Sequence, residues 1–159
     1  MTTVSVPSDL LPHLRRARDL IDGHYAEPLD LTRLAAAARC SAYHFLRSFA
    51  AVYGETPARY LTRRRVERAA ELLRSANLTV TEVCHLVGFA SVGTFSTRFK
   101  QLVGLPPSAY QRQARQRGGP PPIPGCFVLM WSAPQSGRST RAGPAPSVTG
   151  TDGSTRRNR

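Results

Sequence analysis

Long apolar runs, paired cysteines and secretion signals are all missing from this sequence. No apolar run approaches the roughly 18 residues that a membrane-spanning helix needs. The first nine residues have neither a basic start nor an apolar stretch, so no secretory signal is visible. The three cysteines, Cys40, Cys84 and Cys126, are odd in number and widely spaced, which is typical of reduced thiols. We therefore expect a cytoplasmic protein that makes no use of a membrane.

Sequence signatures of catalysis and of metal binding are also absent. There is no glycine-rich phosphate loop, no HExxH spacing and no nucleophile elbow around a serine. The cysteines lack the spacing of metal ligands, and Cys40 and Cys84 fall at the ends of expected helices, where they are interpreted as buried small apolar residues. We expect no enzyme, no cofactor and no metal site.

Acidic residues are few, and the chain carries a large excess of positive charge. The 22 Lys and Arg residues, of which 21 are arginines, face only 10 Asp and Glu residues and give a net charge of +12. Such an imbalance indicates a polyanionic partner, with nucleic acid first and an anionic membrane surface second. The hydrophobic content of 41% is enough for a modest core.

The composition changes near residue 117. Residues 118–159 hold 7 of the 13 prolines and 7 of the 12 glycines, with one apolar segment at 126–131. Such a composition buries too little apolar surface to offset its conformational entropy. The sequence therefore predicts a mostly disordered tail over 118–159, in which 126–131 is interpreted as a short strand or a docking segment.

Residues 1–117 predict seven helices and no strand. Apolar residues recur at helical spacing, Ser, Thr or Pro precedes or opens most segments, and Gly ends several of them. In the third helix, Phe45, Phe49 and Val52 are expected to face inward, and the fifth begins at Thr79 or Thr81. The expected helices cover about residues 10–24, 31–38, 41–54, 57–75, 79–88, 91–104 and 107–115.

A helix-turn-helix unit occurs twice in this part of the chain. A shift of 49 residues places 31–35 on 80–84, and a shift of 50 places 41–60 on 91–110. The matched positions are helix caps, core aromatics and helix stops, and they predict helix-turn-helix units at about 31–54 and 80–104. The pairs are Ser41 and Ser91, Phe45 and Phe95, Phe49 and Phe99, Gly54 and Gly104, Pro57 and Pro107, and Tyr60 and Tyr110.

The helix expected at 57–75 sets the distance between the two units. It would span roughly 28 Å at 1.5 Å per residue, and B-DNA presents the same groove face every ~34 Å. A rod of this length could place two recognition helices in successive major grooves on one face of a duplex. The chain would then read an asymmetric site as a monomer.

These residues resemble the AraC/XylS family of bacterial transcription regulators over about residues 14–115. The resemblance implies an all-α tandem helix-turn-helix domain at 13–117 behind a short leader at 1–12, with no small-molecule effector domain. It further implies a monomeric activator that binds double-stranded promoter DNA. The strongest stretches are Val83-Cys84-x-x-Val87-Gly88-Phe89, Phe95-x-x-x-Phe99-Lys100 and Gly104-x-x-Pro107-x-x-Tyr110.

The outward faces of the third and sixth helices hold the candidate base readers. Family positions matching Tyr43, Leu46 and Arg47 enter the major groove, and the fork of Arg47 matches the O6 and N7 acceptors of guanine. The sixth helix offers a poor set of base readers, so we expect it to contribute positioning and shape readout. Its outward residues are Val92, Gly93, Ser96 and Thr97.

Candidate phosphate contacts come from helix starts and from basic side chains. Backbone N–H groups at a helix start bind phosphate well, and His44 is interpreted as a backbone-contacting or packing residue, not a metal ligand. Only some of the arginines on the 57–75 helix can face DNA, because consecutive residues diverge by ~100°. The candidates are Thr32, Ser41, His44, Arg63, Arg64, Thr81, Ser91, Arg98, Lys100 and Arg112.

Two other interpretations remain open from the sequence. In one, the chain is a protein-interaction module, and its DNA binding is weak or sequence-blind. Segment 126–131 would then dock on the domain itself, on RNA polymerase or on another partner. Trp and Phe are typical anchors of such contacts. In the other, charge alone coats DNA without regard to sequence. The duplicated unit argues against the second.

Overall fold

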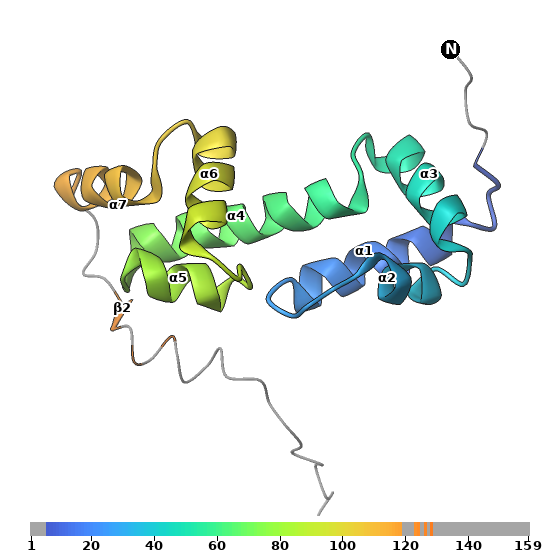
Figure 1. The fold of residues 1–159 in the computed structure, drawn as a ribbon, viewed down its shortest axis with the longest axis horizontal. Coiled ribbons are helices and arrows are strands. Elements are labelled where there is room, and N and C mark those ends of the chain that lie inside the picture. Colours follow the sequence, from blue (N-terminus) through green and yellow to red (C-terminus); the bar gives the residue numbers. More distant parts are fainter. Residues whose placement is uncertain (1–5, 119–122, 125, 127, 129–159) are drawn as a thin grey trace, which may run out of the picture.

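Helices make up nearly all of the part of the chain that the computed structural model describes, which is residues 6–118 with 123, 124, 126 and 128 (Figure 1). The expected seven-helix, tandem helix-turn-helix fold is confirmed. The helices are α1 (Leu11–His24), α2 (Leu31–Ala37), α3 (Ala42–Tyr53), α4 (Pro57–Ser75), α5 (Val80–Leu86), α6 (Val92–Val103) and α7 (Pro107–Gln116).

Local sequence signals begin these helices where they were expected. The hydroxyls of Ser41, Thr56 and Ser91 each accept a hydrogen bond from the backbone N–H three residues later. Thr79 is the residue that starts α5, and it forms a reciprocal capping box with Glu82. The starts of α3, α4, α5 and α6 therefore follow from short-range chemistry.

The expectation of no strand is wrong in one place. The chain is extended at β1 (Ala76–Asn77), directly after α4, and pairs in parallel with β2 (Ile123–Pro124). Val128, beyond β2, is half-buried against the core of the C-terminal half. Part of the tail therefore lies against the domain, while Cys126 is exposed. The remaining residues of segment 126–131, and most of the tail predicted to be disordered, lie outside the described residues.

Two hydrophobic cores share α4. The first joins α1, α2 and α3 to Tyr60 and Leu61, near the start of α4. The second joins α5 and α6 to the later part of α4 through Val66, Ala69 and Leu73. α4 is therefore both the connection between the two units and a wall of each core.

The internal repeat is visible in the packing of aromatic rings. Phe49 meets Tyr60 edge to face at 5.7 Å between ring centroids, and the equivalent pair Phe99 and Tyr110 meets edge to face at 5.5 Å. Such pairs contribute beyond the apolar area they bury. Val52 departs from the expectation, because it is 37% exposed and does not join the first core.

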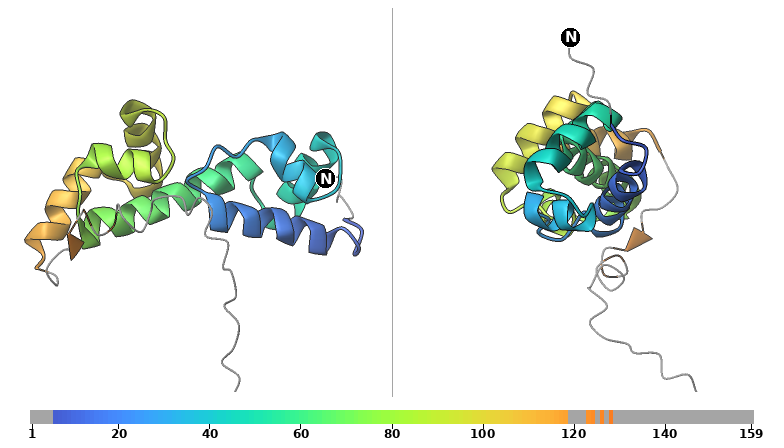
Figure 2. Two further views of the ribbon diagram at one scale, coloured as in Figure 1. Left: turned by 90° about the horizontal axis from the view of Figure 1, so that it is seen from below. Right: turned by 90° about the vertical axis from the view of Figure 1, so that its right-hand side faces the viewer.

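The two units lie at opposite ends of α4. Figure 1 shows α1, α2 and α3 around one end and α5, α6 and α7 around the other, with α3 and α6 on the same side of α4. The view along the long axis in Figure 2 places α3 and α6 in the same half of the molecule. The second helix of each unit is thus presented in a common direction.

Candidate nucleic-acid interface

The exposed face of α3 carries an arginine and a tyrosine that contact each other. Arg47 Nη1 donates to Tyr43 Oη at 2.9 Å, and the guanidinium carbon lies 5.5 Å from the centroid of the Tyr43 ring. Tyr43 is 69% exposed, and Leu46 beside it is also exposed. Because this bond uses one of the five N–H donors of Arg47, the others can serve an acceptor outside the protein.

The exposed face of α6 is small and weakly polar. Gly93 is exposed and nothing lies within 4 Å of where its Cβ would be, so a ligand backbone can approach closely there. Thr97 is exposed but its hydroxyl donates to the Gly93 carbonyl at 3.0 Å, within the helix. Ser96 is half-buried, and Val92 packs against the second core, contrary to its expected outward position.

Most of the expected phosphate-contacting residues are exposed. At the helix starts these side chains are short and polar, and on α6 and α7 they are basic; Arg98 also donates to Gln101 at 3.1 Å. The exposed residues of this group are Thr32, Ser41, His44, Thr81, Ser91, Arg98, Lys100 and Arg112.

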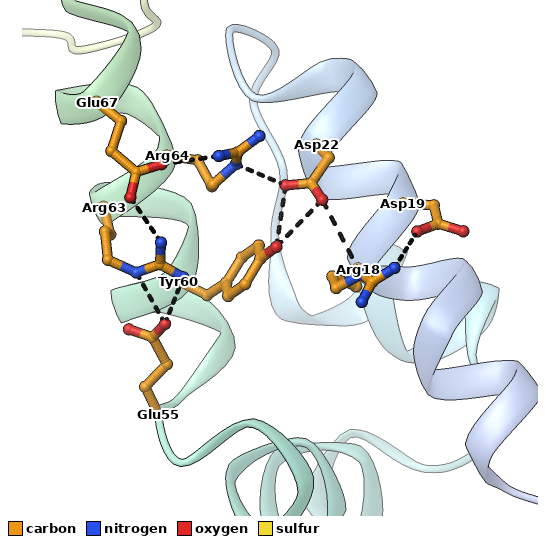
Figure 3. A network of polar contacts seen from close by, with 8 residues as sticks. All are labelled: Arg18, Asp19, Asp22, Glu55, Tyr60, Arg63, Arg64 and Glu67. Carbon is orange, nitrogen blue, oxygen red and sulfur yellow. Dashed lines mark hydrogen bonds and ion pairs between the residues drawn. The ribbon is translucent and has the colours of Figure 1, made fainter. Parts of the chain in front are cut away.

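Arg63 and Arg64 are engaged elsewhere, in a polar network between α1 and α4 (Figure 3). Arg63 pairs with Glu55 at 2.7 Å and with Glu67 at 2.6 Å. Arg64 pairs with Asp22 and with Glu67, each at 2.7 Å. Asp22, from α1, also accepts a hydrogen bond from the Tyr60 hydroxyl at 3.1 Å. The carboxylates neutralise much of the charge that both arginines would bring to DNA.

The ionisation of Glu67 reflects this network. Burial opposes the charged form of the carboxyl, but hydrogen bonds and ion pairs with Arg63 and Arg64 outweigh burial, and the pKa of Glu67 lies below its ordinary value. Hydrogen bonding to Glu55, against the effect of burial, raises the pKa of Arg63. Both groups are therefore charged throughout the ordinary pH range.

Arg65 is one of the arginines on the 57–75 helix that were expected to supply charge for phosphates, but in the structure it connects three parts of the molecule. Its Nε donates to the Tyr25 carbonyl at 2.6 Å, and its Nη2 donates to the Glu27 carbonyl at 2.9 Å. Its guanidinium carbon lies 5.8 Å from the centroid of the Phe89 ring, in the turn between α5 and α6. Because three arginines follow one another on α4, the sequence could not indicate which of them makes these contacts.

Neither a metal site nor a membrane span is found in the described part of the chain. No group of three His, Cys, Asp or Glu side chains there is placed to hold a metal ion. None of the described helices is both long enough and apolar enough to cross a bilayer.

A family model described as a helix-turn-helix domain matches residues 34–113, which is half of the chain. The chain belongs to the AraC family. It is similar to the MmsAB operon regulatory protein of Pseudomonas aeruginosa, with 36% identity over 96 residues that cover 60% of this chain and 31% of the relative. It is also similar to the regulator GbdR of the same species, with 32% identity over 122 residues that cover 75% of this chain and 33% of the relative.

Solved structures of AraC-type domains share the fold. The C-terminal domain of AraT, a response regulator from Geobacillus stearothermophilus, aligns with a TM-score of 0.62 and 36% identity over 67% of this chain and 88% of that one. The DNA-binding domain of AdpA, solved in complex with a target DNA, aligns with a TM-score of 0.64 and 31% identity over 66% and 95%. This AraC-family chain therefore carries a domain of the type that binds double-stranded DNA.

The match is confined to this domain. The chain spans about a third or less of the length of the curated relatives named MmsAB operon regulatory protein, AraC-like transcription regulator and GbdR. What the AraC-family relatives do outside the shared domain does not follow for this chain.

Proposed function

We propose that the chain is a sequence-specific transcription regulator that binds promoter DNA as a monomer and activates transcription. It would place α3 and α6 in two successive major grooves on one face of the duplex. One observation carries this proposal. α3 and α6 lie on the same side of α4, near its two ends, and α4 is a single helix of 19 residues. At 1.5 Å per residue this helix is roughly 28 Å long, close to the ~34 Å turn of B-DNA.

The two units would contribute differently to recognition. On α3, Arg47 offers the donor geometry that guanine accepts, while Tyr43 holds it in place and can itself contact a thymine methyl or a phosphate. On α6, the small face formed by Gly93 and Thr97 supports close approach to the DNA more than base discrimination. We therefore expect the sequence preference to be stronger in the half-site of the first unit.

Phosphate contacts are assigned mainly to residues on the exposed surface of the second unit and at the helix starts. Arg98, Lys100 and Arg112 are exposed and basic. Arg63 and Arg64 are instead proposed to fasten α1 to α4, since each meets two carboxylate partners. The backbone N–H groups at the starts of α3 and α6 would anchor phosphates between the side-chain contacts.

Activation, location in the cytoplasm and the lack of catalysis are proposed for the whole protein. As an activator in the cytoplasm, the chain would contact RNA polymerase while bound to the promoter, and it would have no catalytic activity of its own. The family model and the named regulators support this class of function.

In vitro selection tests the proposal. The full chain would be used to select duplexes from a random pool at two salt concentrations. We expect an asymmetric motif that extends over about two helical turns, with one half more sharply defined. If no motif emerges and binding weakens steeply with salt, charge alone holds the DNA, and the proposal is wrong.

A further inference from the structure

We infer that the loop between α1 and α2 is a spacer that fixes the distance and angle between the two helix-turn-helix units, with Arg65 as its positioning residue. Within this loop, the spacer is residues 25–27, which lie between α4 and the turn that joins α5 to α6. This inference rests on the proposed function, in which one chain binds two major grooves. The spacer would determine which separation of the two half-sites the chain accepts.

One side of the spacer is fastened to α4. Arg65 donates to two of its carbonyls, those of Tyr25 and Glu27, at 2.6 and 2.9 Å. Upstream, α1 is held to the same helix by the ion pair of Asp22 with Arg64 at 2.7 Å and by the Tyr60 hydroxyl (Figure 3). The spacer is thus a fixed part of the first unit.

The other side of the spacer touches the backbone of the second unit. A Cβ added at Gly88, in the turn between α5 and α6, would lie 2.6 Å from the Ala26 carbonyl oxygen and 2.9 Å from its carbonyl carbon. The equivalent turn residue of the first unit is Arg39, which is exposed and carries a full side chain at a φ of 52°. The glycine is therefore needed where the two units meet.

Two attachments restrict motion that one helix would allow. With α4 as the only connection, bending or twisting of that helix would change the distance and angle between α3 and α6. A second contact away from the axis of α4 opposes both movements. Since one inserted base pair shifts a groove by ~3.4 Å and turns it by ~35°, a chain held at two points cannot follow the insertion.

The test measures how binding depends on the separation of the half-sites. Duplexes carrying the selected motif, with zero, one or two base pairs inserted between its halves, are titrated with the full chain. The variants are Arg65→Ala and Arg65→Lys; exposed Arg74→Ala, near the end of α4, is the control that loses the same charge.

We expect the wild type to lose at least about tenfold in affinity for each inserted base pair, since one turn of B-DNA is only 10–10.5 base pairs. Arg65→Ala should reduce that discrimination by about fivefold or more, and Arg65→Lys should fall between the two because an ammonium can still reach one carbonyl. Arg74→Ala should weaken binding to all duplexes by a similar factor.

Residual dipolar couplings of the free protein give a second readout. The wild type should show one alignment tensor for α1–α3 and α5–α7, while the Arg65 variants should show different tensors for the two halves. Circular dichroism establishes whether each variant is folded. If Arg65→Ala is unfolded, both measurements are made with Arg65→Lys alone.

Each outcome decides the matter. Unchanged spacing discrimination and a single tensor in a folded Arg65 variant would overturn the inference. The absence of any two-part motif for the wild type would overturn the proposed function instead.

Discussion

Gly88 and Gly104 share the same positive φ in very different surroundings. Both have a φ of +89°, but a Cβ at Gly104 would meet nothing within 4 Å, whereas one at Gly88 would collide with the backbone of Ala26. We predict that Gly104→Ala lowers the free energy of unfolding by about 1–2 kcal/mol, the cost of a left-handed conformation. Gly88→Ala should cost at least about 2 kcal/mol more.

Urea denaturation of the two variants measures this difference. Because both glycines have a φ of +89°, the excess for Gly88→Ala reports mainly the contact with the spacer. Equal losses of stability would show that the loop between α1 and α2 yields freely to an added methyl group.

Arg47 provides a prediction about base recognition. Arg47→Ala should cost about 1–3 kcal/mol on the selected motif and relax the preference at one base position. Arg98→Ala should instead weaken binding to all sequences alike and reduce the salt slope by about 1. Competition binding with single-base variants of the motif distinguishes these two effects. If Arg47→Ala weakens binding to every variant by the same factor, Arg47 does not read a base.

At the residue level, exposure was predictable for most positions on α3, although not for Val52 there or for Val92 on α6. The partners of the charged side chains were less predictable. The inward spacing of Phe45 and Phe49 correctly left Tyr43, Leu46 and Arg47 on the surface of α3. The pairing of Arg64 with Asp22 spans 42 residues, so no local pattern could indicate it. Only its contact with Glu67, three residues on along the same helix, had a signal in the sequence.

At the level of elements, α4 carries a prediction about pH. The folded state lowers the pKa of Glu67, because its contacts with Arg63 and Arg64 outweigh burial. Its contribution to stability is therefore present above its unfolded pKa of about 4.3 and is lost as the pH falls through the lower folded value. The side chain is 42% exposed, so we expect at most about 1 kcal/mol.

Unfolding free energies between pH 7 and pH 3 test this expectation. Glu67→Gln should be less stable than the wild type at pH 7 and should lose less stability on acidification. If the two curves run parallel through the acid range, the carboxylate contributes nothing through its ionisation.

The elements differ in how well the sequence predicts them. Caps such as Ser41 and Thr56 act through neighbours three residues away, so the starts of α3 and α4 could be placed from the sequence. β1 and β2 could not, because strands of two residues have no alternation of apolar and polar positions. Their pairing also joins positions 47 residues apart, Ala76 and Ile123.

At the level of the whole molecule, the tail contributes to the second unit. Removing residues 118–159 takes away the pairing of β1 with β2 and the contact of Val128 with the second core. We expect a lower unfolding temperature and little change in affinity for DNA, since β2 and α6 lie on opposite sides of α4 in Figure 1. Thermal unfolding and binding titrations of the shortened and full chains check this.

Transcription assays extend the same comparison. Unchanged DNA binding with lost activation in the shortened chain would favour a contact surface in the tail for a partner such as RNA polymerase. A large loss of DNA affinity would contradict the separation of the tail from the DNA-binding face.

In the proposed complex, one chain occupies two successive major grooves. Native mass spectrometry of the complex with the selected duplex measures how many chains bind, with the protein varied from below to above the dissociation constant. We predict one chain per duplex even in excess protein, and the same ratio with weaker binding when either half of the motif is replaced. Two chains on the intact motif, of which one is lost when either half of the motif is replaced, would contradict this prediction.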